Sequence, residues 1–248
     1  MKIRKIISAI LIATIVACCL FLGHEYMKGK QASNELEYIQ NIVDKNVKNS
    51  NKEFTHDTFT ELQKENSEFK GYIKFDSKII ELPIVQAKDN DKYLNLSFYG
   101  KYSQQGTPFI DAYSNLDDTN IIIYAHNVYY DDTAMFSPLT KLIDQTFYEE
   151  NNKFKMYFEN EVREYAITNV YYLDEETYQW YNYQQPTFLD KKEFDEWINY
   201  PDRNNLINSV NGKIESGNKF VTLSTCKKWE EDKRVIVLAK ETKVTKYS

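Results

Sequence analysis

Residues 219–240 read KFVTLSTCKKWEEDKRVIVLAK, and this stretch determines how the rest of the sequence is interpreted. Apolar and polar residues alternate up to Cys226, which predicts a β-strand with Thr222, Ser224 and Cys226 on one face. A second β-rich run opens at Arg234. If the two runs form a hairpin, the end of the first lies beside the start of the second. We therefore expect Cys226 and Arg234 to be neighbours at one rim of a sheet.

Outward from this hairpin, six further β-rich runs are separated by turn-forming polar stretches. Eight such runs favour a mainly β protein with a closed or nearly closed barrel. The eight runs cover residues 71–75, 79–86, 107–112, 120–126, 155–158, 164–173, 219–225 and 234–240. Helical periodicity interrupts them at residues 137–150 and 190–210, and the second interruption lies between the sixth and seventh strands. Long insertions of this kind often shape a binding groove.

The composition is that of a folded, acidic protein. Among 248 residues, 42% are apolar and 15% are aromatic, which is too rich for a disordered chain. The 31 Lys and Arg against 37 Asp and Glu give a net charge of −6, and three of the basic residues precede the folded body. Such an acidic body has no basic footprint for phosphates, so we expect no nucleic-acid partner.

The N-terminus carries a targeting segment. Residues 6–22 contain no charge and follow Lys2, Arg4 and Lys5. With Gly23 they span about 27 Å as a helix, close to the thickness of a bilayer's hydrocarbon core. Basic residues ahead of the run favour an N-terminus inside and a body outside the cell.

We interpret this segment as an uncleaved signal anchor. A cleaved signal peptide competes with it, although residues 21–23 make a poor cleavage site, and so does a lipoprotein signal with Cys18 as the lipidated residue. The expected organisation is a cytoplasmic N-terminus at residues 1–5, a single transmembrane anchor at residues 6–23, helices forming a stalk at residues 24–66, and an extracellular β-barrel domain at residues 67–248.

Three side chains point to chemistry in the exported body. Cys226 is its single cysteine, and an unpaired thiol outside the cytoplasm is either a buried structural residue or a nucleophile. His126 ends a predicted strand, and the other two histidines belong to the stalk, so this imidazole is the one placed to serve the thiol. Arg234 is one of only four arginines, and its guanidinium suits a carbonyl oxygen or an oxyanion.

The motif TLSTC at residues 222–226, the downstream Arg234 and the motif YAHN at residues 124–127 resemble the TLxTC, arginine and histidine signatures of sortases. Sortases are membrane-anchored cysteine transpeptidases of Gram-positive cell walls. The N-terminal helices, the helix-bearing insertion and the segments NDKYL (90–94), FYGK (98–101) and GTPFID (106–111) are similar to class B. The resemblance runs from the anchor to the last strand and implies an eight-stranded sortase-type β-barrel.

The resemblance also implies a mechanism. Cys226 would attack the carbonyl of a Thr in a C-terminal sorting motif of an exported surface protein and form a thioester. His126 would act as general acid and then as general base, and Arg234 would stabilise the substrate carbonyl or oxyanion. A peptidoglycan stem or cross-bridge amine would then take the acyl group. The motif would be LPxTG-like, such as NPxTx or S/PPxTG, and no metal ion or organic cofactor is expected.

By family position, Asn90, Leu94, Tyr124 and Ser224 are expected to line the substrate groove, and Tyr183 to join them from the insertion. For Leu94 and Tyr124, ordinary core packing is the competing interpretation.

Two other functions stay open at this point. One is a non-catalytic, membrane-tethered module whose Tyr and Trp residues bind wall glycan or peptide, and the other is a pilin-polymerising sortase.

A papain-like or NlpC-type peptidase is not favoured because it places its Cys before its His. An L,D-transpeptidase favours a Gly before the nucleophile, where this chain has Thr225. The residue after Cys226 is Lys227, where some class B relatives carry an acid. Any role of that acid is therefore in doubt for this chain.

Overall fold

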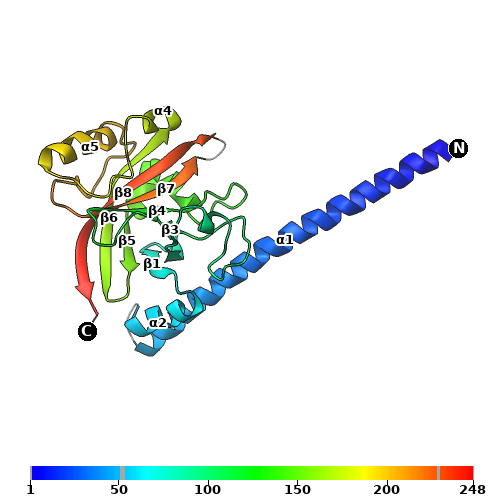
Figure 1. Ribbon diagram of the computed structural model, residues 1–248, viewed down its shortest axis with the longest axis horizontal. Coiled ribbons are helices and arrows are strands. Elements are labelled where there is room, and N and C mark those ends of the chain that lie inside the picture. Colours follow the sequence, from blue (N-terminus) through cyan, green and yellow to red (C-terminus); the bar gives the residue numbers. More distant parts are fainter. Residues whose placement is uncertain (1, 51–53, 228–229, 248) are drawn as a thin grey trace.

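The computed structural model describes residues 2–50, 54–227 and 230–247 (Figure 1). The expected N-terminal segment, stalk and catalytic domain therefore include residues 1, 51–53, 228–229 and 248, which lie outside the described residues. Helices α1 (Lys2–Ser50) and α2 (His56–Glu65) precede the strands. The strands are β1 (Phe69–Phe75), β2 (Glu81–Val85), β3 (Phe109–Ile110), β4 (Asn120–Tyr124), β5 (Lys153–Tyr157), β6 (Glu161–Asp174), β7 (Phe220–Lys227) and β8 (Glu230–Lys246).

The strands close into a barrel in the order β1-β2-β3-β4-β7-β8-β6-β5. Neighbouring strands are antiparallel except for the pairs β2–β3 and β4–β7, which are parallel. Each of the eight predicted β-rich runs forms one of these strands. The prediction of a mainly β, eight-stranded barrel is thus confirmed.

The last hairpin has the predicted register. Strands β7 and β8 are antiparallel, and Cys226 lies opposite Arg234. Strand β8 is much longer than the predicted run because β6 pairs with it from Glu161 opposite Lys246 to Asp174 opposite Lys233.

Three apolar clusters hold the molecule together. The first fills the barrel interior with side chains such as Ile123 and Leu223. The second lies between the outer wall and the N-terminal helices, and the third between the outer wall and the insertion that joins β6 to β7. The insertion carries α4 (Glu175–Tyr178) and α5 (Lys191–Arg203), at the opposite end of the barrel from α2 (Figure 1).

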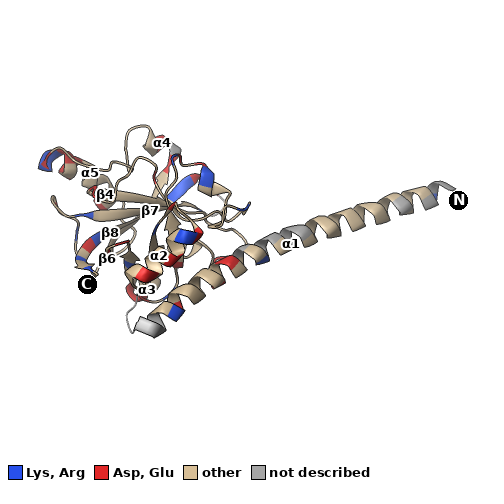
Figure 2. Ribbon diagram, turned by 60° about the horizontal axis from the view of Figure 1, so that its bottom comes forward, with Lys and Arg blue, Asp and Glu red and all other residues tan. Residues whose placement is uncertain are grey.

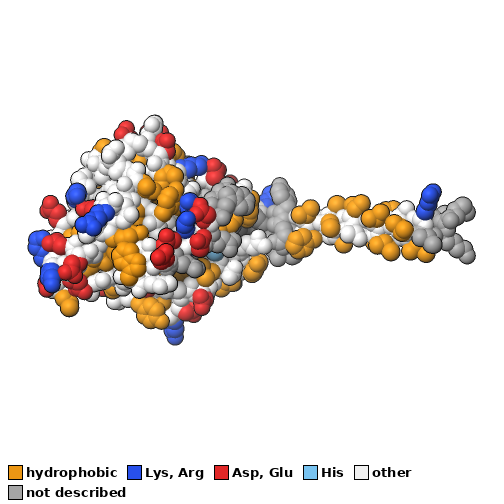
Figure 3. All heavy atoms as spheres, turned by 90° about the horizontal axis from the view of Figure 1, so that it is seen from above, with side chains coloured by type: hydrophobic (Ala, Val, Ile, Leu, Met, Phe, Trp, Pro, Cys, Tyr) orange, Lys and Arg blue, Asp and Glu red, His pale blue; other side chains and the backbone are white. Residues whose placement is uncertain are grey.

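Helix α1 is continuous through the residues expected to form the anchor and the start of the stalk. Its C-terminal part packs on the barrel through Ile39, Ile42 and Val43, which are buried. Its N-terminal part leaves the body as a long rod with hydrophobic side chains exposed along it (Figures 1 and 3). Within this rod, Ile6–Gly23 is long and apolar enough to cross a membrane.

Two helix predictions need correction. Residues 137–150 form a 3₁₀ helix η2 (Ser137–Ile143) and a separate α3 (Gln145–Glu150), because Asp144 caps α3 by accepting a hydrogen bond from the Phe147 N–H. The predicted helix at 190–210 ends at Arg203. Beyond it the chain joins the edge of β6, where the Asn205 side chain accepts from the Val170 N–H and donates to the Thr168 carbonyl. The short helix α4 was not predicted.

Candidate active site

Strand pairing brings together residues that are about a hundred positions apart. Strands β4 and β7 run parallel with Tyr124 opposite Ser224, so His126 and Cys226, each two residues further on, lie at the same end of the sheet. The Asn127 amide supports this end by donating to the Cys226 carbonyl over 3.0 Å. Because side chains alternate along a strand and Leu223 points into the barrel, Ser224 is on its outer face.

Arg234 reaches the thiol from the neighbouring strand. Its Nη1 lies 3.8 Å from Cys226 Sγ, and both side chains are half-buried. Burial by itself lowers the pKa of the Arg234 guanidinium, but the adjoining Tyr178, Tyr183 and Cys226 side chains outweigh it and raise this pKa above its ordinary value. Arg234 is therefore a permanent cation and hydrogen-bond donor beside the sulfur.

The imidazole of His126 is oriented by a backbone carbonyl. Its Nε2 lies 2.8 Å from the carbonyl oxygen of Leu94. A carbonyl can only accept a hydrogen bond, so Nε2 carries a proton in either charge state of the ring. This leaves Nδ1 as the nitrogen that can take up and release a proton.

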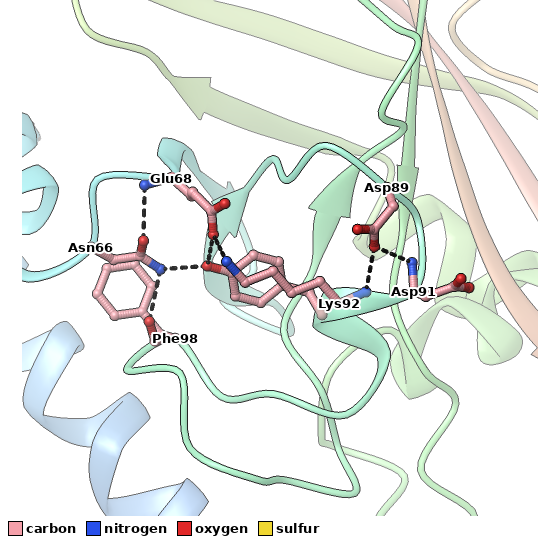
Figure 4. Close-up of polar contacts among 7 residues, drawn as sticks. Asn66, Glu68, Asp89, Asp91, Lys92 and Phe98 are labelled. Carbon is pink, nitrogen blue, oxygen red and sulfur yellow. Dashed lines mark hydrogen bonds and ion pairs between the residues drawn. The ribbon is translucent and has the colours of Figure 1, made fainter.

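The loop that supplies this carbonyl is held by polar side chains (Figure 4). Leu94 ends a short 3₁₀ helix, η1 (Lys92–Leu94), between β2 and β3. The Tyr93 hydroxyl donates to Glu68 Oε2 over 2.7 Å, and Lys92 Nζ contacts the same oxygen at 2.6 Å. The Asn66 amide donates to the Tyr93 hydroxyl over 3.0 Å, so η1 is tied to the chain just ahead of β1.

The start of the same loop is shaped by its own turn chemistry. Asp89 Oδ1 accepts hydrogen bonds from the N–H groups of Asp91 and Lys92 (Figure 4). This is the side-chain-to-backbone pattern with which Asp initiates turns.

Gly106 allows the returning chain to pack against the carbonyl that holds His126. Its φ is +62°, and a Cβ there would lie 2.5 Å from the Tyr93 carbonyl oxygen and 2.8 Å from that of Leu94. Only glycine fits this close approach without displacing backbone atoms.

All eight residues predicted for the site line one cavity of about 430 Å³ on the outside of the barrel. We call this cavity the groove. Its lining comprises Asn90, Leu94, Phe109, Tyr124, Ala125, His126, Tyr178, Tyr183, Gln184, Ser224, Cys226 and Arg234. Leu94 and Tyr124 also pack against the apolar clusters outside the barrel. These two residues therefore line the groove and take part in core packing as well.

Two residues that organise the groove were missed by the sequence analysis. Asp111 is buried, and its Oδ2 accepts from the Asn90 amide over 2.8 Å and from the Tyr124 hydroxyl over 2.9 Å. Gln184 in the insertion donates to the same Tyr124 hydroxyl, which links the two sides of the groove. Burial, with Tyr183 and Asp111 nearby, raises the pKa of Tyr124 far above its ordinary value. The position of Asp111 at the end of a predicted strand was the available signal.

The groove thus combines a thiol, an imidazole and a guanidinium. These are the groups that acyl transfer through a covalent intermediate needs: a nucleophile, a proton carrier and an oxyanion donor. Across residues 2–50, 54–227 and 230–247, no three His, Cys, Asp or Glu side chains gather in a way that would hold a metal ion.

The sortase domain family model matches residues 73–242. The chain belongs to the sortase family. It is 27% identical to sortase B of Staphylococcus aureus, over 99% of this chain and 100% of that protein. It is 28% identical to sortase B of Listeria monocytogenes, over 95% of this chain and 97% of the relative.

The fold of this sortase agrees with that of a solved relative. A structure of the Staphylococcus aureus sortase B-substrate complex superposes with a TM-score of 0.78 at 26% identity, covering 90% of this chain and 100% of that one. The predictions of a class B sortase and of a sortase-type barrel are therefore confirmed, and the protein is a cell-wall transpeptidase by family.

Lys227, the residue after the cysteine, is not among the residues that line the groove of this sortase. Lys227 Nζ pairs with Glu230 at 2.5 Å and lies 4.3 Å from the centre of the Tyr172 ring. The cation is neutralised in place, so it adds little net charge beside Cys226.

Proposed function

We propose that this protein is a membrane-anchored class B sortase that attaches exported surface proteins to peptidoglycan, with Cys226 as nucleophile, His126 as general acid and base, and Arg234 as oxyanion donor. The proposal is supported by the pairing of β7, which carries Cys226, with two other strands. Strand β7 runs parallel to β4, which ends just before His126, and antiparallel to β8, which carries Arg234. The three side chains line one groove.

In the first half of the reaction, the Cys226 thiolate attacks the carbonyl carbon of the Thr in the sorting motif. A C–S bond forms, and the charge that develops on the carbonyl oxygen is stabilised by the Arg234 guanidinium. The peptide bond after the Thr then breaks, and His126 gives the proton on Nδ1 to the leaving amine while Nε2 stays bound to the Leu94 carbonyl.

In the second half, an amine of a peptidoglycan stem or cross-bridge peptide attacks the thioester. Nδ1 of His126 takes the proton from this amine, a C–N bond forms, and the C–S bond breaks to return the thiolate. Asn90, Leu94, Tyr124, Tyr183 and Ser224 hold the sorting motif in the groove, and the chemistry requires no metal ion or organic cofactor.

The cellular arrangement follows from the N-terminal rod. We place residues 1–5 in the cytoplasm, residues 6–23 in the membrane, residues 24–66 outside it as the stalk and residues 67–248 as the extracellular catalytic domain. The apolar Ile6–Gly23 segment supports this topology, since it stands clear of the body.

The test uses the full-length protein in detergent micelles and a library of peptides of the LPxTG, NPxTx, SPxTG and PPxTG types. We expect cleavage after Thr, read by mass spectrometry, and a mass adduct of the acyl group on the protein. Cys226→Ala should abolish both. The matched control is Cys18→Ala combined with Cys19→Ala, which removes the other two thiols and should retain cleavage.

Two outcomes would contradict the proposal. Cleavage that survives in Cys226→Ala would exclude the thioester mechanism. Absence of cleavage by the unmodified protein, together with retention of the peptides or of wall fragments, would favour the non-catalytic binding module.

A further inference from the structure

A second cavity, of about 530 Å³, lies in the insertion and has no part in the proposed acyl transfer. We call it the insertion pocket. It shares a wall with the groove, because successive residues of one loop serve the two cavities. Tyr183 and Gln184 line the groove, while their neighbours Asn182 and Gln185 line the insertion pocket. A ligand in the insertion pocket is thus bound next to the groove.

The insertion pocket presents an aromatic face that is fixed in place. Trp180 is 68% exposed, and its ring meets the edge of Tyr200 at 5.3 Å and 74°. Tyr200 in turn stacks on Tyr181 at 4.4 Å, and the buried Trp197 donates its indole N–H to the Asn182 carbonyl over 2.7 Å. A large exposed aromatic face supported in this way is a typical interaction site.

Polar groups at the rim of the pocket are available to a ligand. Asn199 and Arg203 are exposed, and within the described part of the chain their side chains take part in no hydrogen bond or ion pair. Glu193, by contrast, is occupied by the Gln185 amide and the Leu189 N–H. Residues of both signs lie side by side along α5, so the rim has no strong charge of one sign (Figure 2).

This combination favours a sugar over a peptide. The C–H groups on one face of a pyranose ring carry partial positive charge and pack on the negative face of an indole. Hydroxyl and acetamido groups around the ring then take hydrogen bonds from side-chain amides and a guanidinium. The exposed Trp180 ring and the exposed Asn199 and Arg203 side chains offer these two kinds of contact.

The location of the pocket indicates which sugar. Helices α4 and α5 lie on the side of the barrel far from the N-terminal end of α1 (Figures 1 and 2). With Ile6–Gly23 in the membrane, the helices of the insertion lie on the side of the barrel far from the bilayer, which is the side of the wall.

We infer that the insertion pocket binds an N-acetylated sugar of the peptidoglycan glycan strand, with the ring on Trp180 and its substituents on Asn199 and Arg203. Binding there holds the acceptor stem or cross-bridge close to the thioester. The choice of a wall sugar and the role in acceptor selection rest on the proposed function and its membrane topology, whereas binding of an N-acetylated sugar in the pocket does not.

Sugar binding is tested by saturation-transfer NMR on the full-length protein with the trimer of N-acetylglucosamine as probe. We expect saturation of the ring C–H and acetyl methyl protons, its loss in Trp180→Ala and a reduction in Arg203→Gln. Tyr113→Ala, which removes an even more exposed aromatic ring outside the insertion pocket, should keep the signal. An unmodified protein without saturation, or a Trp180→Ala variant with full saturation, would overturn the inference.

The role in acceptor selection is tested by comparing a disaccharide-linked stem peptide with the same peptide lacking sugar. We expect the unmodified protein to transfer the acyl group to the sugar-linked acceptor about tenfold more efficiently, and Trp180→Ala to bring this ratio close to one. A ratio unchanged by the substitution, or a raised KM for long sorting peptides alone, would contradict acceptor binding. If the unmodified protein does not cleave sorting peptides at all, the proposed function fails, and the NMR experiment alone decides the pocket.

Discussion

The two walls of the groove are built in different ways. On one wall, Cys226 and Arg234 are placed by the backbone ladder of β7 and β8, which does not depend on their side chains. On the other wall, the Leu94 carbonyl that orients His126 belongs to a loop held by side-chain hydrogen bonds, each worth about 0.5–1.5 kcal/mol net. Substitutions on the first wall should therefore change chemistry without changing stability, whereas those on the second should change both.

The largest effect is expected on the ladder wall, from Arg234→Lys. The ammonium keeps the charge but loses the fork of donors at the developing oxyanion, so we expect kcat to fall by about 10²–10³-fold with an almost unchanged melting temperature. Steady-state cleavage of a sorting peptide and thermal unfolding measure the two quantities. Lys233→Arg, one residue away in a surface ion pair with Glu230, is the control and should retain kcat. A large drop in melting temperature for Arg234→Lys would contradict the idea of a ladder-determined wall.

On the loop wall, the largest effect is expected from Gly106→Ala. The alanine would have to adopt a positive φ, and its Cβ would press on the carbonyl oxygens of Tyr93 and Leu94. We therefore expect a loss of about 1–3 kcal/mol in unfolding free energy and a lower kcat. Gly100→Ala is the matched control. Gly100 has φ +71° but nothing within 4 Å of a Cβ, so it isolates the backbone strain from the contact. Equal kcat in the two variants would show that the Leu94 carbonyl does not position His126.

A smaller effect on the same wall is expected from Tyr93→Phe. Loss of the hydroxyl that donates to Glu68 should lower the unfolding free energy by about 1 kcal/mol and reduce kcat, because η1 and the Leu94 carbonyl become less well held. The control is Tyr148→Phe, which also removes a buried hydroxyl. This hydroxyl donates to the Ile167 carbonyl over 2.9 Å, and neither residue lines the groove. If both variants lose stability and only Tyr93→Phe loses kcat, the hydroxyl acts by positioning; a similar loss of kcat in both would show a purely structural role.

The smallest effect is a pH dependence of the stability that Glu68 contributes on the loop wall. Burial alone would raise the pKa of Glu68, but the hydrogen bonds from Lys92 and Tyr93 outweigh it and lower this pKa below its ordinary value of 4.5. A depressed pKa in the folded state means that the carboxylate stabilises the fold above the unfolded-state pKa, and that this contribution is lost as the pH falls through the folded-state pKa. The difference in melting temperature between the unmodified protein and Glu68→Gln should therefore be present at pH 7 and shrink below about pH 4.5. A difference that stays constant down to pH 3 would contradict this.

The sequence by itself determined the strands, the class B resemblance and the pairing of Cys226 with Arg234. Alternation of side chains is a local property, and an antiparallel hairpin joins segments that are close in sequence, so both can be read along the chain. The apolar run at residues 6–23 is likewise visible without a structure. All eight residues proposed for the site were named at this level, most of them through the family motifs.

Only the tertiary structure decided how the groove is completed. The parallel pairing of β4 with β7 joins residues a hundred positions apart, and such a pairing has no local pattern. The partner of His126 is a backbone carbonyl, a group that every residue possesses, so no residue type at position 94 announces it. The links from Asp111 to Asn90 and Tyr124, and the aromatic face of the insertion pocket, likewise arise only where separate segments pack against one another.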